Sequence, residues 1–522
     1  MDKDNNRYTA IGISGNKISF LGTNLESQKI ETATRIDLKG KTVLPGFIDS
    51  HLHMLNYAFL ANSYKMYDAS SIKNIIEEGR NHAYAMEGES ANQWLYGRGW
   101  NQDNFSDEKR FLTKADLDKI STDRPILFIR MCGHVAAVNS KALEMVMKLN
   151  ETKDYMTQID TKKGILTEAS VKLCYNIMNP PTVEQIKQMI LSVQGDYNKA
   201  GITAVESDNF LSLPGRNWQN IMTAYKELET EKKLTLRVRE QASFTAFDDM
   251  KEFIDSGNRT NQGGAFYKVG PIKLYQDGSL GAKTALLNEP YGGSKANCGI
   301  MVHSEEELGK MVEYSYKNDM QILTHTIGDK ASDMVCTAYE KAIQKYGDKN
   351  LRLAINHLQI ISSDLIERMA KSNILAYIQP VFVAGDKNFV GKYIGPKREK
   401  LSYIWKSMED GGLVCCGGSD SPVENFDILE NIQIAVTRDG LNEKSNGWMP
   451  DQKLSIEESI RLFTTNNAYG AFEEKSRGTI ETGKLADIVI LDKDPFEVEP
   501  HQVNSIKIEL TMVDGEVVYH RA

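Results

Sequence analysis

The chain has 522 residues, of which 41% are apolar and 25% are charged, so it is long enough for two or more domains and can bury a core. Its formal net charge of −9 argues against a nucleic acid or an anionic membrane as a partner. Six scattered cysteines without a CxxC spacing, a polar start and no apolar run of about 18 residues predict a cytoplasmic protein with reduced thiols.

The two ends of the chain have the pattern of short β-strands. "AIGISGNKISFLG" near the start, and "ADIVILDKDPF" and "IELTMVDGEVVYH" near the end, alternate apolar and polar residues around Gly, Asp and Asn turns. Neither end has enough strands to be stable alone. We therefore expect residues 1–45 and 477–522 to pair into one small β-sandwich.

The middle of the chain, residues 46–476, alternates strand-like and helix-like segments. Strands that alternate with helices predict a parallel sheet, and eight strands close a (β/α)8, or TIM-like, barrel. Three helices begin with a capping box, formed by Ser304 with Glu307, Ser455 with Glu458 and Thr182 with Gln185. The eight predicted strands are "TVLPGFIDSHLH", "GITAVES", "LTLRVREQA", "KVGPIKLYQ", "MQILTHT", "LRLAINHL", "ILAYIQP" and "GGLVCCGGSD".

The first two predicted strands are far apart in the sequence. About 150 residues separate them, which is too many for a single crossover connection. We expect an inserted subdomain of mixed α and β structure at about residues 60–190. The predicted fold class is therefore α/β: a TIM-like barrel with a large insertion after strand 1, and a β-sandwich built from both chain ends.

His51 and His53 stand at the end of the first predicted barrel strand, in "LPGFIDSHLHM". Residues two apart in a strand point to the same side, with Cα atoms roughly 6.6 Å apart. Two imidazoles side by side at the carboxyl end of a barrel strand can hold one divalent ion. They can equally be two hydrogen-bonded polar residues at a strand end, and the pair alone does not decide between these interpretations.

Four more polar residues belong to other barrel strands. His325 ends the fifth strand, His357 ends the sixth, Asp420 follows the eighth and Lys273 lies in the fourth. Each alone has an ordinary structural explanation: a core histidine, an aspartate that caps a helix, or a lysine that reaches from the barrel rim. Together they place titratable residues on one rim of the barrel, where such residues are usually catalytic.

With these residues the sequence resembles the amidohydrolase superfamily. "PGFIDSHLH", the lysine of the fourth strand, the two later histidines and the "GSD" aspartate carry the resemblance. "GRGWNQDNF", "GHVAAVNSKAL", "DGSLGAKTALL" and "HTIGDKA" narrow it to the YtcJ-like branch, amidohydrolase family 3. The resemblance covers nearly the whole chain.

The resemblance implies a set of metal ligands. His51 and His53 match the ligands of the more buried ion, and His325 and His357 match those of the more exposed ion. Lys273, carboxylated by carbon dioxide, matches a bridge between two ions, and Asp420 matches the aspartate that binds metal and takes the proton from water. Two Zn²⁺ per chain are expected, although manganese, iron or cobalt suit the same donors. An uncarboxylated Lys273 would leave a site for one ion.

The function implied is metal-dependent hydrolysis of a C–N bond in an amide, N-acyl compound, carbamate or cyclic amide. A metal-activated hydroxide would attack, with Asp420 as general base and then general acid. The alternative is a deaminase with one ion, and a third interpretation is a binding protein that kept the fold without catalysis. The expected partner is a small-molecule substrate. A homodimer is the commonest state for a soluble enzyme, and no residue pattern indicates the oligomeric state.

Four further residues are candidates for substrate binding: His134, Asp277, Arg98 and Trp100. His134 can equally be structural, and Trp100 is typical of a tryptophan buried beneath a loop. Glu168 and Asp329 are candidates to orient ligands, although Asp329 is equally suited to cap the helix that follows it.

Overall fold

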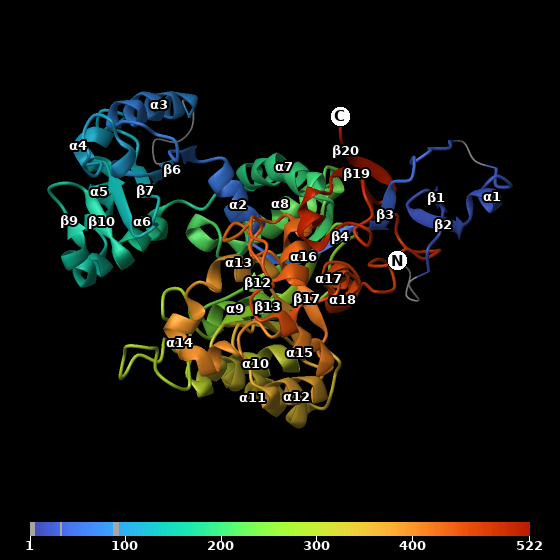
Figure 1. The fold of residues 1–522 in the computed structure, drawn as a ribbon. Coiled ribbons are helices and arrows are strands. Elements are labelled where there is room, and N and C mark those ends of the chain that lie inside the picture. Colours follow the sequence, from blue (N-terminus) through green and yellow to red (C-terminus); the bar gives the residue numbers. More distant parts are fainter. Residues whose placement is uncertain (1–5, 32–33, 87–92) are drawn as a thin grey trace. The chain divides into compact units, whose positions relative to one another are not determined.

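The computed structural model of the chain describes residues 6–31, 34–86 and 93–522 (Figure 1). By its internal contacts the chain divides into two compact units. Unit 1 comprises Met1–Met54, Gln194–Phe210 and Tyr225–Ala522, and unit 2 comprises Leu55–Val193 and Leu211–Ala224. In the described part of the chain, no helix is long and apolar enough to span a membrane.

Unit 1 contains a parallel sheet of eight strands in the order β17-β16-β15-β14-β13-β12-β11-β4. Its first and last strands are joined at their carboxyl ends, where Asp420 N–H donates to His51 O at 2.8 Å and His53 N–H donates to Ser421 O at 2.7 Å. The strands are β4 (Phe47–Leu52), β11 (Ile202–Ser207), β12 (Arg237–Ser243), β13 (Tyr267–Tyr275), β14 (Ile322–Thr326), β15 (Ala354–His357), β16 (Leu375–Ile378) and β17 (Cys415–Gly417). All eight predicted strands are present, and the predicted TIM-like barrel is confirmed.

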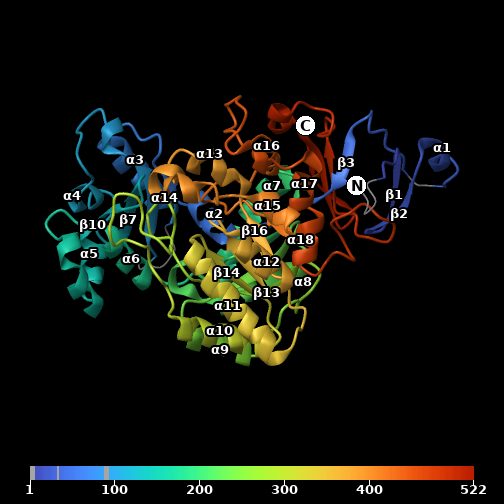
Figure 2. The same ribbon diagram turned by 60° about the horizontal axis from the view of Figure 1, so that its bottom comes forward.

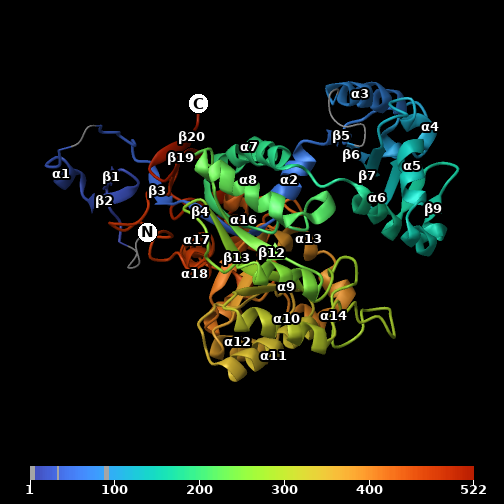
Figure 3. The ribbon, with the colours of Figure 1, turned by 180° about the vertical axis from the view of Figure 1, so that it is seen from behind.

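Helices cover the outside of the barrel, which explains why the strands are apolar on both faces. Every residue of β4, β11 and β12 is buried, as expected for parallel strands between helices and a packed interior. Figure 2 shows α9, α10 and α11 outside β13 and β14, and Figure 3 shows the same helices outside β13 from behind. The helices are α9 (Phe247–Asp255), α10 (Glu305–Lys317), α11 (Asp329–Tyr346), α12 (Ser363–Lys371), α13 (Val383–Asp386), α14 (Val390–Glu399), α15 (Trp405–Asp410), α16 (Ile428–Thr437), α17 (Ile456–Leu462) and α18 (Thr465–Gly470).

The predicted capping boxes are present. In α10 the side chains of Ser304 and Glu307 each accept from the other's backbone N–H, and Ser455 and Glu458 do the same in α17. Thr182 and Gln185 make the same reciprocal bonds at the start of α7 (Val183–Lys199). Each box satisfies backbone donors that the first turn of a helix leaves without a partner.

Both chain ends contribute to the antiparallel part of unit 1. β3 from the N-terminal side pairs with β18, and β18, β19 and β20 continue the four-stranded sheet (Figure 1). A hairpin of β1 and β2 packs on this sheet in a small core that contains Ile18 of β2, Val43 of β3 and Met512 of β19. The elements are β1 (Ala10–Ser14), β2 (Lys17–Gly22), α1 (Asn24–Ser27), β3 (Thr42–Pro45), β18 (Ile488–Leu491), β19 (Ile508–Val513) and β20 (Glu516–His520). The predicted β domain from both ends is confirmed, and its exact residue bounds stay a prediction.

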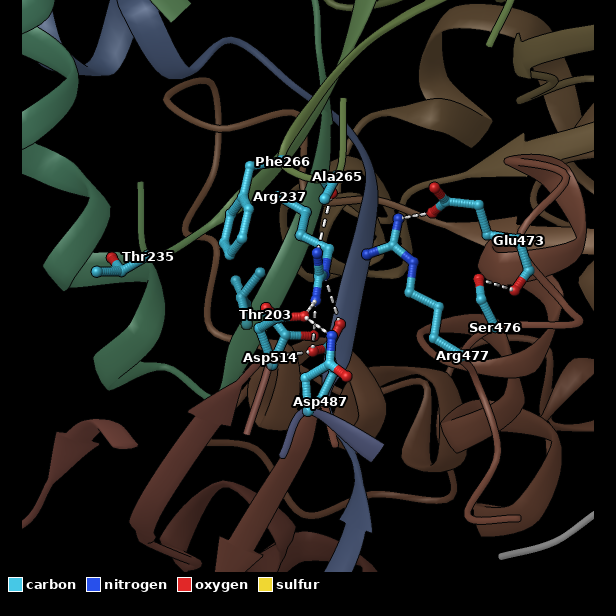
Figure 4. Close-up of polar contacts among 12 residues, drawn as sticks. Thr203, Thr235, Arg237, Ala265, Phe266, Glu473, Ser476, Arg477, Asp487 and Asp514 are labelled. Carbon is cyan, nitrogen blue, oxygen red and sulfur yellow. Dashed lines mark hydrogen bonds and ion pairs between the residues drawn. The ribbon is translucent and has the colours of Figure 1, made fainter. Parts of the chain in front are cut away.

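A buried ion pair joins the barrel to this sheet. Arg237, the first residue of β12, donates to both carboxylate oxygens of Asp487 at 2.7 and 3.0 Å and to Asp514 Oδ1 at 2.8 Å (Figure 4). The side chains of Arg237 and Asp487 are 5% and 2% exposed, so neither charge is solvated by water. A buried charge is tolerated when it is paired and hydrogen-bonded, as here.

Unit 2 holds the segment between β4 and β11, and it has mixed α and β structure as predicted for the insertion. Its six strands lie in the order β5-β6-β7-β8-β10-β9, with β5, β6 and β7 parallel and the others antiparallel. Helices α7 and α8 also contain residues of unit 1. The elements are α2 (Met54–Ala61), β5 (Tyr64–Lys65), α3 (Ile72–Ala85), β6 (Leu95–Trp100), α4 (Lys114–Leu117), β7 (Ile126–Arg130), β8 (Val135–Val138), α5 (Ser140–Met147), β9 (Ile159–Asp160), β10 (Ile165–Thr167), α6 (Lys172–Ile177) and α8 (Trp218–Thr230).

Candidate metal centre

The six predicted metal ligands all lie in unit 1, at or near the carboxyl ends of barrel strands. The sequence places them there because parallel strands end at the same rim of a barrel. His51, Lys273 and Asp420 are buried, and His53 and His325 are partly buried. The six are His51 in β4, His53 just after it, Lys273 in β13, His325 in β14, His357 at the end of β15 and Asp420 after β17.

The structure brings these side chains together. Asp420 Oδ1 lies 3.0 Å from His51 Nε2 and 3.1 Å from His53 Nε2. His51, His357 and Asp420 each offer one ligand atom, and these atoms lie within 4.8 Å of one another. Lys273 Nζ is 3.5 Å from His51 Nε2, and the ring centroids of His325 and His357 are 4.5 Å apart.

Two residues of this cluster have an unusual backbone. His357 has a φ of 75° and Asp420 has a φ of 60°, in the left-handed region that residues with a side chain rarely adopt. Such conformations persist where the surrounding structure holds them, and they concentrate at functional sites. His357 ends β15 and Asp420 follows β17, so both unusual conformations lie at the rim where the cluster forms.

In three of the histidine rings, Nδ1 contacts an oxygen acceptor outside the cluster. Nδ1 of His51 lies 2.7 Å from Gln241 Oε1, and Nδ1 of His53 lies 3.2 Å from the carbonyl oxygen of Asp208. Nδ1 of His357 lies 2.7 Å from Gln379 Oε1. Because these partners are acceptors, Nδ1 donates and Nε2 carries the lone pair.

His325 is held the opposite way round. Its Nε2 lies 3.1 Å from the carbonyl oxygen of Gly278 and 3.5 Å from Asp277 Oδ1. Both partners are acceptors, so Nε2 carries the hydrogen and Nδ1 is the nitrogen with a lone pair.

The donor set fits a divalent metal ion. His51 donates from Nδ1 to Gln241, so its Nε2 carries no hydrogen. This Nε2 lies 3.0 Å from Asp420 Oδ1, so two hydrogen-bond acceptors face each other. Such a contact is favourable only when a cation, either a proton or a metal ion, lies between the two atoms. Burial and the nearby Lys273 charge lower the pKa of His51, which disfavours the proton. Imidazole nitrogen with carboxylate oxygen is a donor set typical of zinc.

The charges of the cluster are strongly perturbed by burial. Burial lowers the pKa of Lys273 to about 8, although Asp208 and Asp420 oppose this shift. Burial alone would raise the pKa of Asp420, but the adjacent imidazole rings of His51 and His53 hold it well below its usual value. Burial and Lys273 lower the pKa of His325 to about 4. His325 is therefore neutral at pH 7, and Asp420 is ionised.

Asp49 connects the two strands that close the barrel at this site. Its Oδ1 accepts from the backbone N–H groups of His51 and Ser419, both at 3.1 Å, and the residue is fully buried. Burial raises the pKa of Asp49 to about 7. The side chain ties the end of β4 to the loop that carries Asp420.

Asp277, predicted to contact substrate, lies beside this cluster with a fully buried side chain. Its carboxylate accepts from the backbone N–H groups of Leu286, Ile327 and Gly328, at 2.8 to 3.0 Å. These contacts hold the loops that follow β13 and β14 together, so Asp277 shapes the rim of the site.

Asp329 is the first residue of α11, and Gly328 is the N-cap. Its carboxylate accepts from the backbone and side-chain amides of Asn288, at 3.1 and 3.0 Å. Asp329 therefore fastens the loop after β13 to α11, and it does not contact a ligand histidine among the described residues.

The other substrate-binding candidates lie in unit 2. Trp100 is fully buried, and its indole N–H donates to Phe128 O at 3.0 Å. His134 is exposed and its Nδ1 lies 2.9 Å from Glu168 Oε2. Arg98 is partly buried in β6. The contacts of Trp100 and His134 are within unit 2, and the roles of all three toward substrate stay predictions.

Sequence reasoning missed Gln241, Gln379 and Asp208. Each stands at the carboxyl end of a barrel strand or just after it, which is the signal that identified the histidines. Glutamine is uncharged and forms no motif with a histidine far away in the chain, so its position alone was the available clue.

Comparisons with known proteins find relatives that match most of the chain. The model of a family described as "Amidohydrolase family" matches residues 34–519. A putative amidohydrolase, YtcJ, of Bacillus subtilis is 31% identical over 93% of this chain and 90% of its own. An N-substituted formamide deformylase of Arthrobacter pascens is 24% identical over 100% and 96%.

A solved structure has the same fold. It is an uncharacterized metal-dependent hydrolase from Pyrococcus furiosus, with a TM-score of 0.79 and 27% identity, and the match covers 93% of this chain and 95% of that one. The family match, the barrel and the histidine–aspartate cluster agree. The chain belongs to the amidohydrolase family and is a metal-dependent hydrolase that acts on carbon–nitrogen bonds.

Proposed function

We propose that this enzyme hydrolyses the C–N bond of an amide, N-acyl compound, carbamate or cyclic amide, with Asp420 as the group that takes and returns the proton. One observation carries this proposal: the Nε2 atoms of His51 and His53 both face Asp420 Oδ1, at 3.0 and 3.1 Å. N-substituted formamides are the first substrates to test, because a relative similar along the whole chain is named for their deformylation.

The cluster has enough donors for two ions. His51 and His53 would hold one ion, and His325 and His357 would hold the other, with Asp420 as a further ligand. Lys273 would bridge the two when carboxylated. Its pKa of about 8 supports this, because an appreciable neutral fraction at pH 7 can react with carbon dioxide. When bound, divalent zinc would act as a Lewis acid on the substrate carbonyl and lower the pKa of water toward neutrality.

Asp420 is suited to move the proton. The pKa of Asp420 lies well below its usual value, so the carboxylate is ionised at pH 7 and its oxygen atoms can accept a proton from the attacking water. At 7% exposure it is shielded from bulk solvent, so the proton stays within the site. The same carboxyl group would then donate this proton to the leaving nitrogen, which departs as a neutral amine.

A screen of zinc-loaded protein tests this function. We expect hydrolysis of at least one compound in a panel of N-substituted formamides, N-acyl amines, carbamates and cyclic amides, detected by the amine and acid released. Activity should disappear after zinc is removed by a chelator and return when zinc is added. Zinc-loaded protein that is inactive across the whole panel would contradict the proposal.

A deaminase with one ion is the second candidate. The tight group of His51, His357 and Asp420 supports it, since three residues suffice for one ion. Ammonia release from aminopurines or aminopyrimidines, with one zinc ion per chain, would favour this candidate. Close to two ions per chain and no ammonia release would favour the hydrolase.

A further inference from the structure

In two of the histidines, the ring nitrogen that faces away from the cluster contacts a glutamine side chain. Gln241 Oε1 lies 2.7 Å from His51 Nδ1, and Gln379 Oε1 lies 2.7 Å from His357 Nδ1. Both glutamines are buried, at 0% and 3% exposure. They come from β12 and from the residue after β16, so neither shares a strand with its histidine.

The orientation of Gln241 follows from its second contact. Its Nε2 donates to the backbone carbonyl oxygen of Ser50 at 2.8 Å. A carbonyl oxygen can only accept, so the nitrogen of the amide must face Ser50 and its oxygen must face His51. An amide oxygen also can only accept, so Nδ1 of His51 must carry the hydrogen.

Asp420 acts on the same ring in the opposite sense. Its Oδ1 lies 3.0 Å from Nε2 of His51, and a carboxylate stabilises a hydrogen on that nitrogen. Without an acceptor at Nδ1, a neutral ring would place its hydrogen on Nε2, toward Asp420. A metal ion could then bind Nε2 only after that hydrogen had been displaced.

His357 belongs to a closed ring of hydrogen bonds. Its Nδ1 faces Gln379 Oε1, Gln379 Nε2 donates to Asn356 Oδ1 at 3.0 Å, and Asn356 Nδ2 lies 2.9 Å from His357 Nε2. The amide nitrogen of Asn356 can only donate, so Nε2 of His357 has the lone pair. An ion at this nitrogen would take the place of the Asn356 donor.

We propose that Gln241 and Gln379 are positioning residues that select the tautomer of His51 and His357, so that Nε2 of each ring is the nitrogen available to a metal ion. This inference rests on the proposed role of the two histidines as metal ligands. Partners that orient ligand histidines usually contribute strongly to metal affinity, and their loss costs roughly 10–100-fold.

The tautomers can be read in zinc-free protein by ¹⁵N NMR of the imidazole nitrogens, with the His51 and His357 signals assigned by their loss in single variants. We expect a hydrogen on Nδ1 of both rings in the wild type. In Gln241→Met, which keeps a long side chain but has no acceptor, we expect the hydrogen of His51 to move to Nε2. A bare Nδ1 in wild-type His51 would overturn the proposal.

Zinc affinity, measured by competition with a fluorescent chelator, is the second readout. We expect Gln241→Met and Gln379→Met to weaken zinc binding by roughly 10–100-fold. Gln321→Met is the matched control, because Gln321 is also fully buried in unit 1 and its amide donates to Arg352 O and Gly470 O, away from the cluster. It should keep wild-type zinc affinity even if its stability falls.

The outcomes separate this inference from the proposed function. Wild-type zinc affinity in both methionine variants would overturn the positioning role while leaving the metal site intact. Wild-type protein that binds no zinc would contradict the proposed function, and the tautomers measured without zinc would still decide whether the two glutamines select the proton position.

Discussion

Lys273 is the residue on which the number of metal ions depends. It is the one cationic side chain among the six predicted ligands, and it lies 3.5 Å from His51 Nε2. As an ammonium group it would repel metal ions, whereas a carbamate on the same nitrogen would supply two anionic oxygens.

We therefore expect Lys273→Met to lower the zinc content from about two ions per chain to about one, because the bridging oxygens are lost. Metal analysis of dialysed protein measures this. Wild-type protein prepared in ¹³C-bicarbonate should also give a carbamate carbon signal that Lys273→Met lacks. Two ions per chain in the variant would show that the lysine is not a bridge.

At the scale of single residues, the histidines and Asp420 could be predicted because each ends a barrel strand with a titratable side chain. The direction of each ring could not. It depends on partners such as Gln241, which is 190 residues from His51 in the chain. No local pattern records such a contact, so it is visible only once the strands are side by side.

At the scale of elements, the joint between β12 and the C-terminal sheet depends on the buried pair of Arg237 and Asp487. Arg237→Met would leave the Asp487 carboxylate buried without its partner, which typically costs about 3–5 kcal/mol. We expect a clearly lower midpoint of urea unfolding for this variant.

Arg521→Met is the matched control for this prediction. Arg521 pairs with Glu509 at 3.1 Å but is 45% exposed, and exposed pairs contribute about 0–1 kcal/mol. Equal unfolding midpoints for the two variants would show that the buried pair does not stabilise the joint.

Glu473, after α18, is the centre of a second charged group at the amino-terminal side of the barrel. It pairs with Lys268 of β13 at 2.7 Å. It also pairs with Arg477, as Figure 4 shows. Burial alone would raise the pKa of Glu473, but the charges of Arg477 and Lys268 lower it to about 2. The carboxylate therefore stabilises the fold above its unfolded pKa of about 4.5, and this contribution is lost as the pH falls from there toward 2.

We expect Glu473→Gln to have a lower thermal unfolding midpoint than the wild type at pH 7. The difference should shrink as both are acidified below pH 4.5, because the wild-type group becomes protonated. Unfolding curves at pH 7, 5 and 3 measure this, and a difference that does not change with pH would exclude an electrostatic origin.

The element pattern was the most predictable part of the fold. Buried parallel strands such as β4 and β11 appear in the sequence as short apolar runs, and capping boxes mark where helices such as α10 begin. The division of the chain into two units is harder to predict, because α7 and α8 each contain residues of both and no composition change marks the division.

At the scale of the whole molecule, the barrel collects one site from distant parts of the chain. The six residues extend from His51 to Asp420, and the parallel order of the strands brings them to one rim. The barrel strands therefore carry the predicted metal ligands, and the loops that follow these strands are where we expect substrate selectivity. His134, Arg98 and Trp100 lie in unit 2, and their role in substrate binding stays a prediction.

The comparison of zinc-loaded wild type with Asp420→Asn tests the central claim most directly. The measurement is the rate of amine release from the best substrate of the panel, with the zinc content of both proteins determined. We expect kcat to fall by roughly 10²–10⁴-fold in Asp420→Asn, because the asparagine cannot accept a proton from water. Equal rates in the two zinc-loaded proteins would contradict the assignment of Asp420 as the proton acceptor.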